Sequence, residues 1–159
     1  MPKTLEERFQ RLEDIEAIRQ LKARYCEACD DDHNAEAISA LFVEDGVWTG
    51  TGGPPHAQGR AAIREYMNSV RASGRIRNSA HMLMNPVIRV DGEHATGSWR
   101  LLMMFTGNAK GGSTQYHRII GRYENEFVRR DGKWYFQRLH VTVVESGAYA
   151  AEESKLGEV

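Results

Sequence analysis

The stretch RYCEACDDDHN, residues 24–34, brings together side chains that could support three kinds of chemistry. Cys26 and Cys29 have the spacing of a thiol redox pair. The same cysteines, together with His33, could begin a metal site. In the third interpretation, one carboxylate from the aspartate run partners a distant base, and the cysteines only pack the helix. The rest of the chain has to decide between these three.

The positions of the two cysteines argue against redox and metal chemistry. A redox C-x-x-C opens a helix after a strand, because the helix dipole there lowers the thiol pKa, whereas Cys26 and Cys29 fall late in a helical pattern. A structural zinc site needs four ligands, and the chain has no further cysteine. We therefore interpret the pair as packing residues and expect neither a metal nor another cofactor.

The first half of the chain is predicted to be helical. From Leu5 to Tyr25, apolar residues recur every three or four positions, which predicts a helix ending near residues 30–32. Asp31, Asp32 or Asn34 is expected to cap the helix that follows. The remaining elements of this half are a short helix over 35–42, a strand over 45–50, a loop rich in glycine and proline over 49–59, and a helix over 60–72.

The second half reads as an antiparallel meander. Strand-like segments cover residues 81–90, 95–105, 114–130 and 133–146. Asp91-Gly92 and Asp131-Gly132 supply hairpin turns at two of the joins. Helices followed by such strands predict an α+β fold, with a curved antiparallel sheet wrapped around the helices. We expect one domain over residues 1–146 and a polar tail over 147–159.

The sheet is expected to enclose a deep apolar pocket. Apolar side chains occupy both faces of two of the strands, so one face must pack on the helices, and the other must line a cavity or be covered by a partner chain. A bent sheet with a helix across its mouth gives a dead-end pocket. Four methionines are candidates for its lining, with core filling as the alternative: Met82, Met84, Met103 and Met104.

Few polar groups are placed to work in such a pocket. Asp30 ends the long helix near the expected mouth, and His81 opens the first long strand. A carboxylate bonded to one imidazole nitrogen fixes the tautomer and leaves the other nitrogen to remove a proton. The Tyr25 hydroxyl could donate to a carbonyl or to a leaving hydroxyl. A purely structural role for His81 is the alternative.

The other histidines carry weaker signals. His117 and His140 lie in later strands, and the sequence leaves open whether either reaches the pocket. Loop positions are expected for His33, His56 and His94.

Composition excludes several classes of protein. The chain has 159 residues and a formal net charge of -1, so it lacks the basic excess of a nucleic-acid binder. No apolar run approaches the ~20 residues of a membrane helix, and the N-terminus lacks the apolar core of a signal peptide. We expect a cytoplasmic protein that binds neither nucleic acid nor membrane.

Several segments resemble a known family: LEDIEAIRQLKARYCEACDDDHNAEAISALFVEDGVW, GRAAIREYM, AHMLMNPVIRVDGEHATGSW and YENEFVRRDGKWYFQRL. Over residues 5–145 the chain is similar to the SnoaL-like branch of the nuclear-transport-factor-2-like superfamily, and within it to dehydratases and dehydrochlorinases of the bile acid, scytalone and lindane type. The resemblance implies a cone-shaped α+β barrel with a deep apolar pocket, and often a homotrimer, although a dimer stays open. It places Asp30, His81 and Tyr25 on catalytic positions.

At other positions the chain departs from these enzymes. Polar groups that contact their substrates are replaced by Trp48, Met103, Phe105, Leu139 and Val143. Together with Met84 and His117, these residues are predicted to bind the substrate. The replacements favour a hydrophobic small molecule, aromatic or polycyclic.

The resulting hypothesis is a cofactor-independent lyase, with dehydration as the first choice. His81, oriented by Asp30, would remove a proton from carbon while a neighbouring group departs, and Tyr25 would assist. Water, halide and formaldehyde stay open as leaving groups. The alternatives are an isomerase or cyclase with the same base, and a non-catalytic ligand carrier or oxygenase small subunit.

Overall fold

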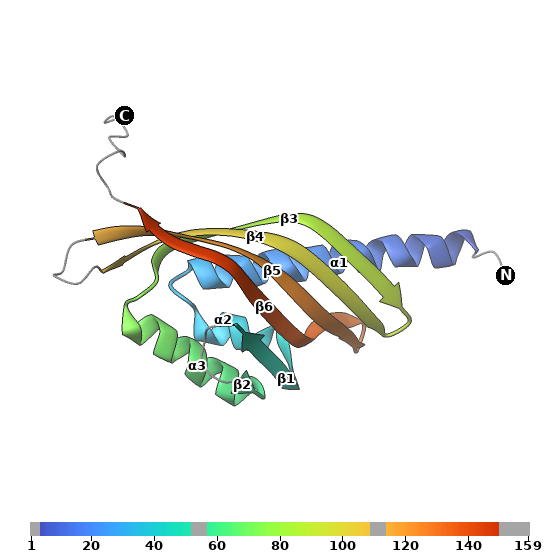
Figure 1. Cartoon of the computed structure of the whole chain (residues 1–159). Coiled ribbons are helices and arrows are strands. Elements are labelled where there is room, and N and C mark those ends of the chain that lie inside the picture. The colour runs from blue at the N-terminus through green and yellow to red at the C-terminus, as the bar shows by residue number, and fades with distance from the viewer. Residues whose placement is uncertain (1–3, 52–56, 109–113, 150–159) are drawn as a thin grey trace, which may run out of the picture.

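The computed structural model describes residues 4–51, 57–108 and 114–149. Helices come first and long strands follow, which confirms the predicted α+β class (Figure 1). The elements are α1 (Leu5–Asp30), α2 (Ala35–Ala40), β1 (Phe42–Gly50), β2 (Ala57–Gln58), α3 (Arg60–Ser73), β3 (Arg77–Asp91), β4 (His94–Asn108), β5 (Thr114–Arg130) and β6 (Lys133–Tyr149).

The strands form one curved, open sheet in the order β2-β1-β6-β5-β4-β3. As predicted, β3 to β6 are an antiparallel meander. The predicted curved antiparallel sheet has one exception among its described strand pairs, since β1 pairs with β6 in parallel. Alternating hydrophobicity tells which face of a strand is buried but not which strand lies beside it, so this pairing was not readable from the sequence.

The three helices lie on the same side of the sheet as its buried face (Figure 1). Ile18, Leu21 and Tyr25 of α1 join the hydrophobic core with inward residues of β4 to β6. The first turns of α1 extend past the sheet, where Leu5, Phe9 and Leu12 are exposed. The predicted apolar stripe of this helix is therefore buried only in its second half.

The structure contains the predicted hairpin turn at Asp131-Gly132 and one of the predicted helix caps. Asp131 and Gly132 both have positive φ, 50° and 74°, as the tight hairpin between β5 and β6 requires. Of the three predicted caps for the second helix, Asn34 performs the role, because its side chain accepts a hydrogen bond from the backbone N–H of Ala37. Asp31 in turn accepts from the Asn34 amide. Asp32 instead pairs with Arg71 of α3.

Several boundaries differ from the prediction: α2 ends at Ala40 rather than at residue 42, β1 begins at Phe42 rather than at residue 45, and β3 begins at Arg77 rather than at residue 81. The last strand continues to Tyr149, so residues 147–149 belong to the sheet rather than to the predicted tail, and residues 150–159 lie outside the described part. Within the predicted loop over 49–59, Ala57–Gln58 form the short strand β2. His56 is outside the described residues.

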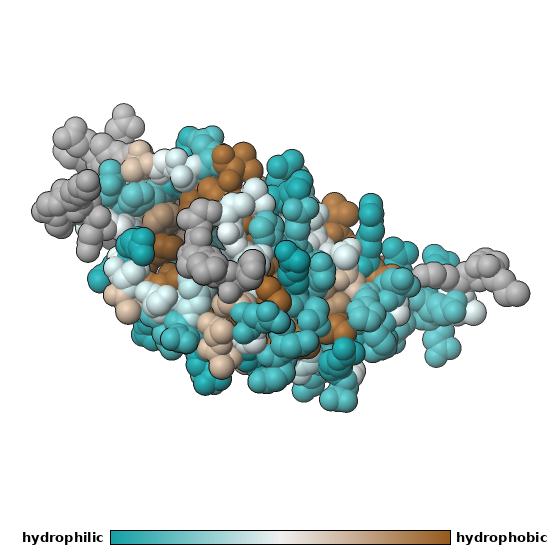
Figure 2. Space-filling model, turned by 60° about the horizontal axis from the view of Figure 1, so that its bottom comes forward, coloured by the Kyte–Doolittle hydropathy of each residue, from teal (hydrophilic) through white to brown (hydrophobic). Residues whose placement is uncertain are grey.

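The surface on the helix side is mostly hydrophilic and is interrupted by smaller hydrophobic areas (Figure 2). Among the described residues, no helix is long and apolar enough to cross a membrane.

Candidate active site

Asp30 and His81 form a close pair where the end of α1 meets β3. Nδ1 of His81 lies 2.6 Å from Oδ1 of Asp30. The backbone N–H of His81 also donates to Oδ2, at 2.9 Å. The His81 side chain is 6% exposed and that of Asp30 is 28% exposed. Two contacts from one residue to both carboxylate oxygens fix the imidazole relative to the end of the helix.

Ser79 is a third member of this cluster that the sequence analysis missed. It precedes His81 by two positions in β3, and its hydroxyl donates to Oδ1 of Asp30 at 2.8 Å. Burial raises the pKa of Asp30, but the hydrogen bonds from His81 and Ser79 outweigh burial and lower that pKa. The carboxylate is thus stabilised at a helix C-terminus, where the macrodipole alone would disfavour it.

This arrangement determines which imidazole nitrogen can act as a base. An ionised Asp30 can only accept hydrogen bonds, so Nδ1 of His81 carries the proton that it donates to Oδ1. In the neutral ring, Nε2 is then the nitrogen with a free lone pair. A carboxylate that fixes the tautomer in this way is the orienting partner that general bases require.

Replacing His81 with phenylalanine is expected to raise the pKa of Asp30, because the ring keeps its size but loses the N–H that stabilises the carboxylate. Carbon NMR titration of the aspartate side chains would measure this change, and Ser79→Ala should shift the same pKa upward by less. An unchanged Asp30 titration in both variants would contradict the hydrogen-bonded cluster.

The same cluster predicts a pH dependence of stability. The folded-state pKa of Asp30 is lowered, so its contribution is present above the unfolded value of ~3.9 and is lost as the pH falls through the folded pKa. The difference in the free energy of unfolding between wild type and His81→Phe should therefore become smaller as the pH falls through the folded-state pKa of Asp30.

His81 also faces an apolar cavity of about 250 Å³. Tyr25 also lines this cavity, and its hydroxyl accepts a hydrogen bond from Nε1 of Trp48 at 2.9 Å. Burial raises the pKa of Tyr25 well above its ordinary value, and the neighbouring Cys29 and Tyr123 add to this effect. Tyr25 therefore keeps its proton and can act as a hydrogen-bond donor. The cavity thus combines a base, a neutral donor and mainly apolar walls.

Three of the predicted substrate-binding residues line this cavity: Trp48, Met103 and Val143. Their role in binding stays a prediction. Two others, Phe105 and His117, line a neighbouring hollow instead, where their rings stack 4.9 Å apart at 10°. The bend of the sheet separates positions that the sequence places along one inward face.

Two predicted substrate-binding residues are corrected by the structure. Met84 is 45% exposed on the outer face of the sheet, because side chains alternate along β3 and His81, three positions earlier, points inward. Met82 and Met104 share that outer, exposed face. Leu139 is fully buried, but it packs in the hydrophobic core rather than lining the cavity.

The last strand also settles the question about His140. Its Nδ1 lies 2.6 Å from the Thr49 hydroxyl and its Nε2 lies 3.2 Å from the Thr142 hydroxyl. It does not line the cavity.

Other cavity residues were not singled out by the sequence analysis. His33, expected in a loop, lies in the turn after α1 with a φ of 53° and is buried against the cavity. Burial and then the nearby His81 lower the pKa of His33. Tyr66 and Tyr123 also line the cavity. Alternation along β5 could have placed Tyr123 on the inward face with Ile119, whereas nothing in the sequence predicted the position of His33.

The cysteines behave as packing residues. Both thiols are free and buried. Burial raises the pKa of Cys26 to about 11, and it also raises that of Cys29. Such thiols are protonated at neutral pH and are poor nucleophiles, which does not favour the redox interpretation.

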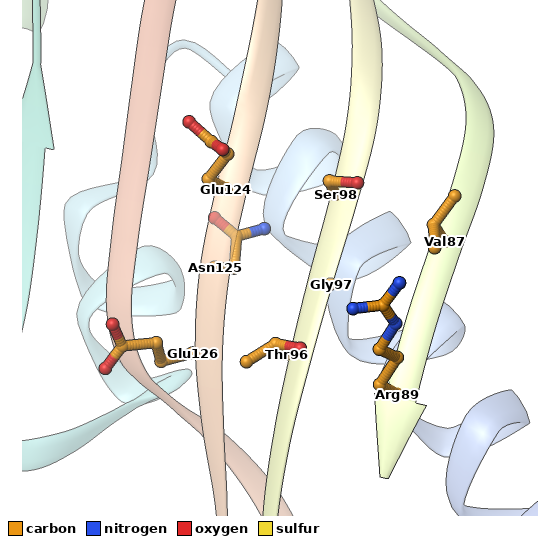
Figure 3. Close-up of a pocket in the computed structure, with 8 residues that line it drawn as sticks. All are labelled: Val87, Arg89, Thr96, Gly97, Ser98, Glu124, Asn125 and Glu126. Carbon is orange, nitrogen blue, oxygen red and sulfur yellow. The ribbon is translucent and has the colours of Figure 1, made fainter.

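A further hollow, of about 340 Å³, lies against β3, β4 and β5 (Figure 3). Its lining is mostly polar and includes Arg89, Glu124 and Glu126, with Thr96 and Ser98 between them. Glu124 is paired with Arg122. Because this lining contains neither a histidine nor a cysteine, the apolar cavity beside His81 is the better candidate site.

Comparisons with known proteins agree with this architecture. The pattern of a SnoaL-like domain matches residues 10–140. A candidate aromatic ring hydroxylase from Novosphingobium aromaticivorans is 28% identical, with 87% of this chain and 94% of that one covered and a TM-score of 0.75. A candidate scytalone dehydratase from the same organism is 23% identical, with 88% and 90% covered and a TM-score of 0.74.

The hexachlorocyclohexane dehydrochlorinase LinA-type3 from Novosphingobium barchaimii is also 23% identical, with 90% and 94% covered and a TM-score of 0.77. At 23% identity these last two similarities show the shared fold. None of the curated proteins matches the chain.

Proposed function

Since the chain belongs to the SnoaL-like domain family of the NTF2-like superfamily, we propose that it is a cofactor-independent lyase acting on a hydrophobic small molecule. The observation that carries the proposal is the 2.6 Å contact between Asp30 and His81 at the wall of an apolar cavity. A pure ligand carrier has no need of an oriented base in its binding cavity.

In the proposed reaction, Nε2 of His81 takes a proton from a carbon next to an electron-withdrawing carbonyl. The released electron pair forms the new carbon–carbon double bond, and a hydroxyl on the neighbouring carbon leaves as water after receiving a proton. Tyr25, kept protonated by burial, donates a hydrogen bond to the carbonyl oxygen or to the departing hydroxyl. The proton that the departing hydroxyl receives is the one that His81 has taken from carbon, so the imidazole returns to its neutral form and the step balances.

The expected rate enhancement has two sources. A well-placed general base contributes about 10²- to 10⁴-fold. Holding the substrate in a closed cavity next to that base adds several kcal/mol, about 7–11 kcal/mol at the upper limit for ideal alignment.

The similar structures include a candidate scytalone dehydratase and a dehydrochlorinase. Both names describe eliminations, which supports a lyase and leaves the leaving group open between water and halide. We place water first because a departing hydroxyl depends more on a hydrogen-bond donor than a departing halide does, and the Tyr25 hydroxyl is such a donor. Loss of formaldehyde is a third possibility with the same base: His81 would take the proton of a hydroxymethyl group, the carbon–carbon bond would break to release formaldehyde, and the remaining carbanion would take up the proton.

The proposal is tested with a panel of aryl β-hydroxy ketones, aryl β-halo ketones and hydroxymethyl ketones in deuterated water. Proton NMR would follow both the loss of the leaving group and the exchange of the α-proton, with His81→Phe as the matched inactive control. Elimination that the wild type catalyses and His81→Phe does not would support the lyase. Exchange or double-bond migration without elimination would instead identify an isomerase or cyclase.

The wild type could instead bind the panel compounds tightly and catalyse neither exchange nor elimination. That result would contradict the lyase and identify a non-catalytic binding protein.

The homo-oligomer also stays a prediction, with a trimer as the first choice. Exposed apolar side chains on the outer face of β3 to β6 would suit a second copy: Met82, Met84, Met104, Ile120 and Val144. Sedimentation velocity is expected to show an oligomer that Met104→Glu weakens. A monomer at all protein concentrations would contradict it.

A further inference from the structure

The cavity beside Asp30 and His81, the two residues of the proposed catalytic dyad, adjoins a larger hollow of about 760 Å³. Four residues line both spaces: Tyr66, Val70, Ile76 and Ile119. These shared side chains form the boundary between the two spaces, so a substrate with one end beside His81 would have to pass between them to reach the hollow.

The inner cavity by itself holds only a small group. Its volume of about 250 Å³ lies below the ~300–1,000 Å³ typical of sites for drug-sized ligands. A cavity of ~150 Å³ is enough for benzene, so one ring or two fused rings can lie beside His81. Any larger substrate must place its remaining part in the outer hollow.

One wall of the hollow is aromatic. The stacked rings of Phe105 and His117 come from paired positions on β4 and β5. Tyr66, whose ring also packs on Trp48 with centroids 4.7 Å apart, stands at the junction with the inner cavity. These rings suit a flat or alkyl segment that leads away from the dyad.

The charge of the hollow is positive. None of its described lining residues is acidic, and two are arginines. Arg118 is neutralised by Glu145 at 2.7 Å. Arg75 forms no ion pair with any residue in the described ranges. Arg75 and Tyr66 both line the hollow, and the charge of Arg75 lowers the pKa of Tyr66 against the opposite effect of burial.

We propose that the outer hollow binds the non-reacting part of the substrate and that Arg75 binds a carboxylate carried by that part. The substrate class is then an amphipathic acid, with a small apolar ring at its reactive end and a terminal carboxylate. The assignment of Arg75 depends on the proposed function only because that function places the ring of the substrate beside Asp30 and His81. A guanidinium is suited to this task because its donors match the two carboxylate oxygens.

The test uses phenylbutanoate, phenylhexanoate and phenyloctanoate, each compared with the alcohol of the same length by isothermal titration calorimetry. In the wild type, at least one acid is expected to bind about 5- to 20-fold more tightly than its alcohol at low salt, since an exposed charge pair contributes modestly. Added salt should narrow the difference. The length that gives the largest difference reports the span from the inner cavity to Arg75.

Arg75→Gln should abolish the preference for the acid and leave the affinity for the alcohol unchanged. Arg118→Gln is the matched control from the same hollow, and the preference should survive in it because Glu145 already neutralises Arg118. Equal affinities of acid and alcohol in the wild type would overturn the proposal, as would an equal loss of both in Arg75→Gln or no binding of any probe.

The same titrations in His81→Phe separate this proposal from the lyase. A preference for the acid that persists in this variant supports the assignment of Arg75 whether or not any compound is turned over.

Discussion

Lys22→Met is expected to raise the free energy of unfolding at pH 7 by about 2–4 kcal/mol. Lys22 is 1% exposed in the second half of α1, and its Nζ has no hydrogen-bond partner among the described residues. Burial lowers its pKa from 10.5 to about 7. Lowering the pKa from 10.5 to about 7 corresponds to a cost of about 5 kcal/mol for burying the charged rather than the neutral amine.

The surroundings of the Lys22 amine explain why the expected gain in stability of Lys22→Met is smaller than this cost. Nζ lies 3.2 Å from the ring centre of Tyr123 and 4.6 Å from that of Tyr25. Aromatic faces attract a cation, so part of the cost of burying the charge is already offset. Methionine has a similar length and packs well against aromatic rings.

The pH dependence has a definite sign. The folded-state pKa of Lys22 is lowered, so between pH of about 7 and 10.5 the unfolded chain binds the extra proton and stability rises with pH. Above about pH 9 this rise is opposed, because burial raises the folded pKa of Cys26, Cys29, Tyr25 and Tyr123, and the unfolded chain then loses their protons first. The Lys22 effect is therefore cleanest between about pH 7 and 8.5.

Urea unfolding at several pH values in this window would measure both effects. The wild type should gain stability as the pH rises, and Lys22→Met should be more stable with a flatter profile. Lys133→Met, an exposed lysine in β6, is the control and should change little. A destabilised Lys22→Met protein with an unchanged pH profile would show that the folded protein stabilises the ammonium.

The second large effect concerns the dyad. Once a panel compound is turned over, His81→Phe is expected to lower kcat by about 10²- to 10⁴-fold because it removes the general base. Asp30→Asn should lower it by about 10- to 100-fold, since the base remains but loses the carboxylate that fixes its tautomer. Ser79→Ala should have the smallest effect of the three, because it removes only one hydrogen bond to that carboxylate.

Comparing kcat with KM separates catalysis from binding. All three changes act on the base or on its hydrogen bonds, so kcat should fall by a much larger factor than the affinity for a non-reacting probe. Nitrogen NMR of labelled histidine adds a readout that a merely structural role of Asp30 would not move. The Nδ1–H tautomer of His81 should dominate in the wild type and become mixed in Asp30→Asn. Full activity in His81→Phe would exclude the proposed mechanism.

The elements of this protein were largely readable from local sequence. The apolar periodicity of α1, the amide cap of Asn34 and the turn at Asp131-Gly132 act within a few residues, so neighbouring side chains determine them. Residue chemistry together with the family resemblance also singled out Asp30 and His81 as an acid–base pair. The inward or outward direction of Met84 and Tyr123 follows from alternation once one residue of each strand is placed, and it could have been predicted.

Other features of the site depend on contacts between segments that are distant in the sequence, and only the tertiary structure determined them. Asp30 and His81 are 51 residues apart, and their hydrogen bond exists because the end of α1 packs against β3. The parallel pairing of β1 with β6, the burial of His33, and the separation of Phe105 and His117 from the inner cavity depend on how the sheet bends around the helices. A sequence pattern records which side of an element avoids water. It carries no information on the curvature that divides one inward face between a small apolar cavity beside His81 and an outer hollow that contains two arginines.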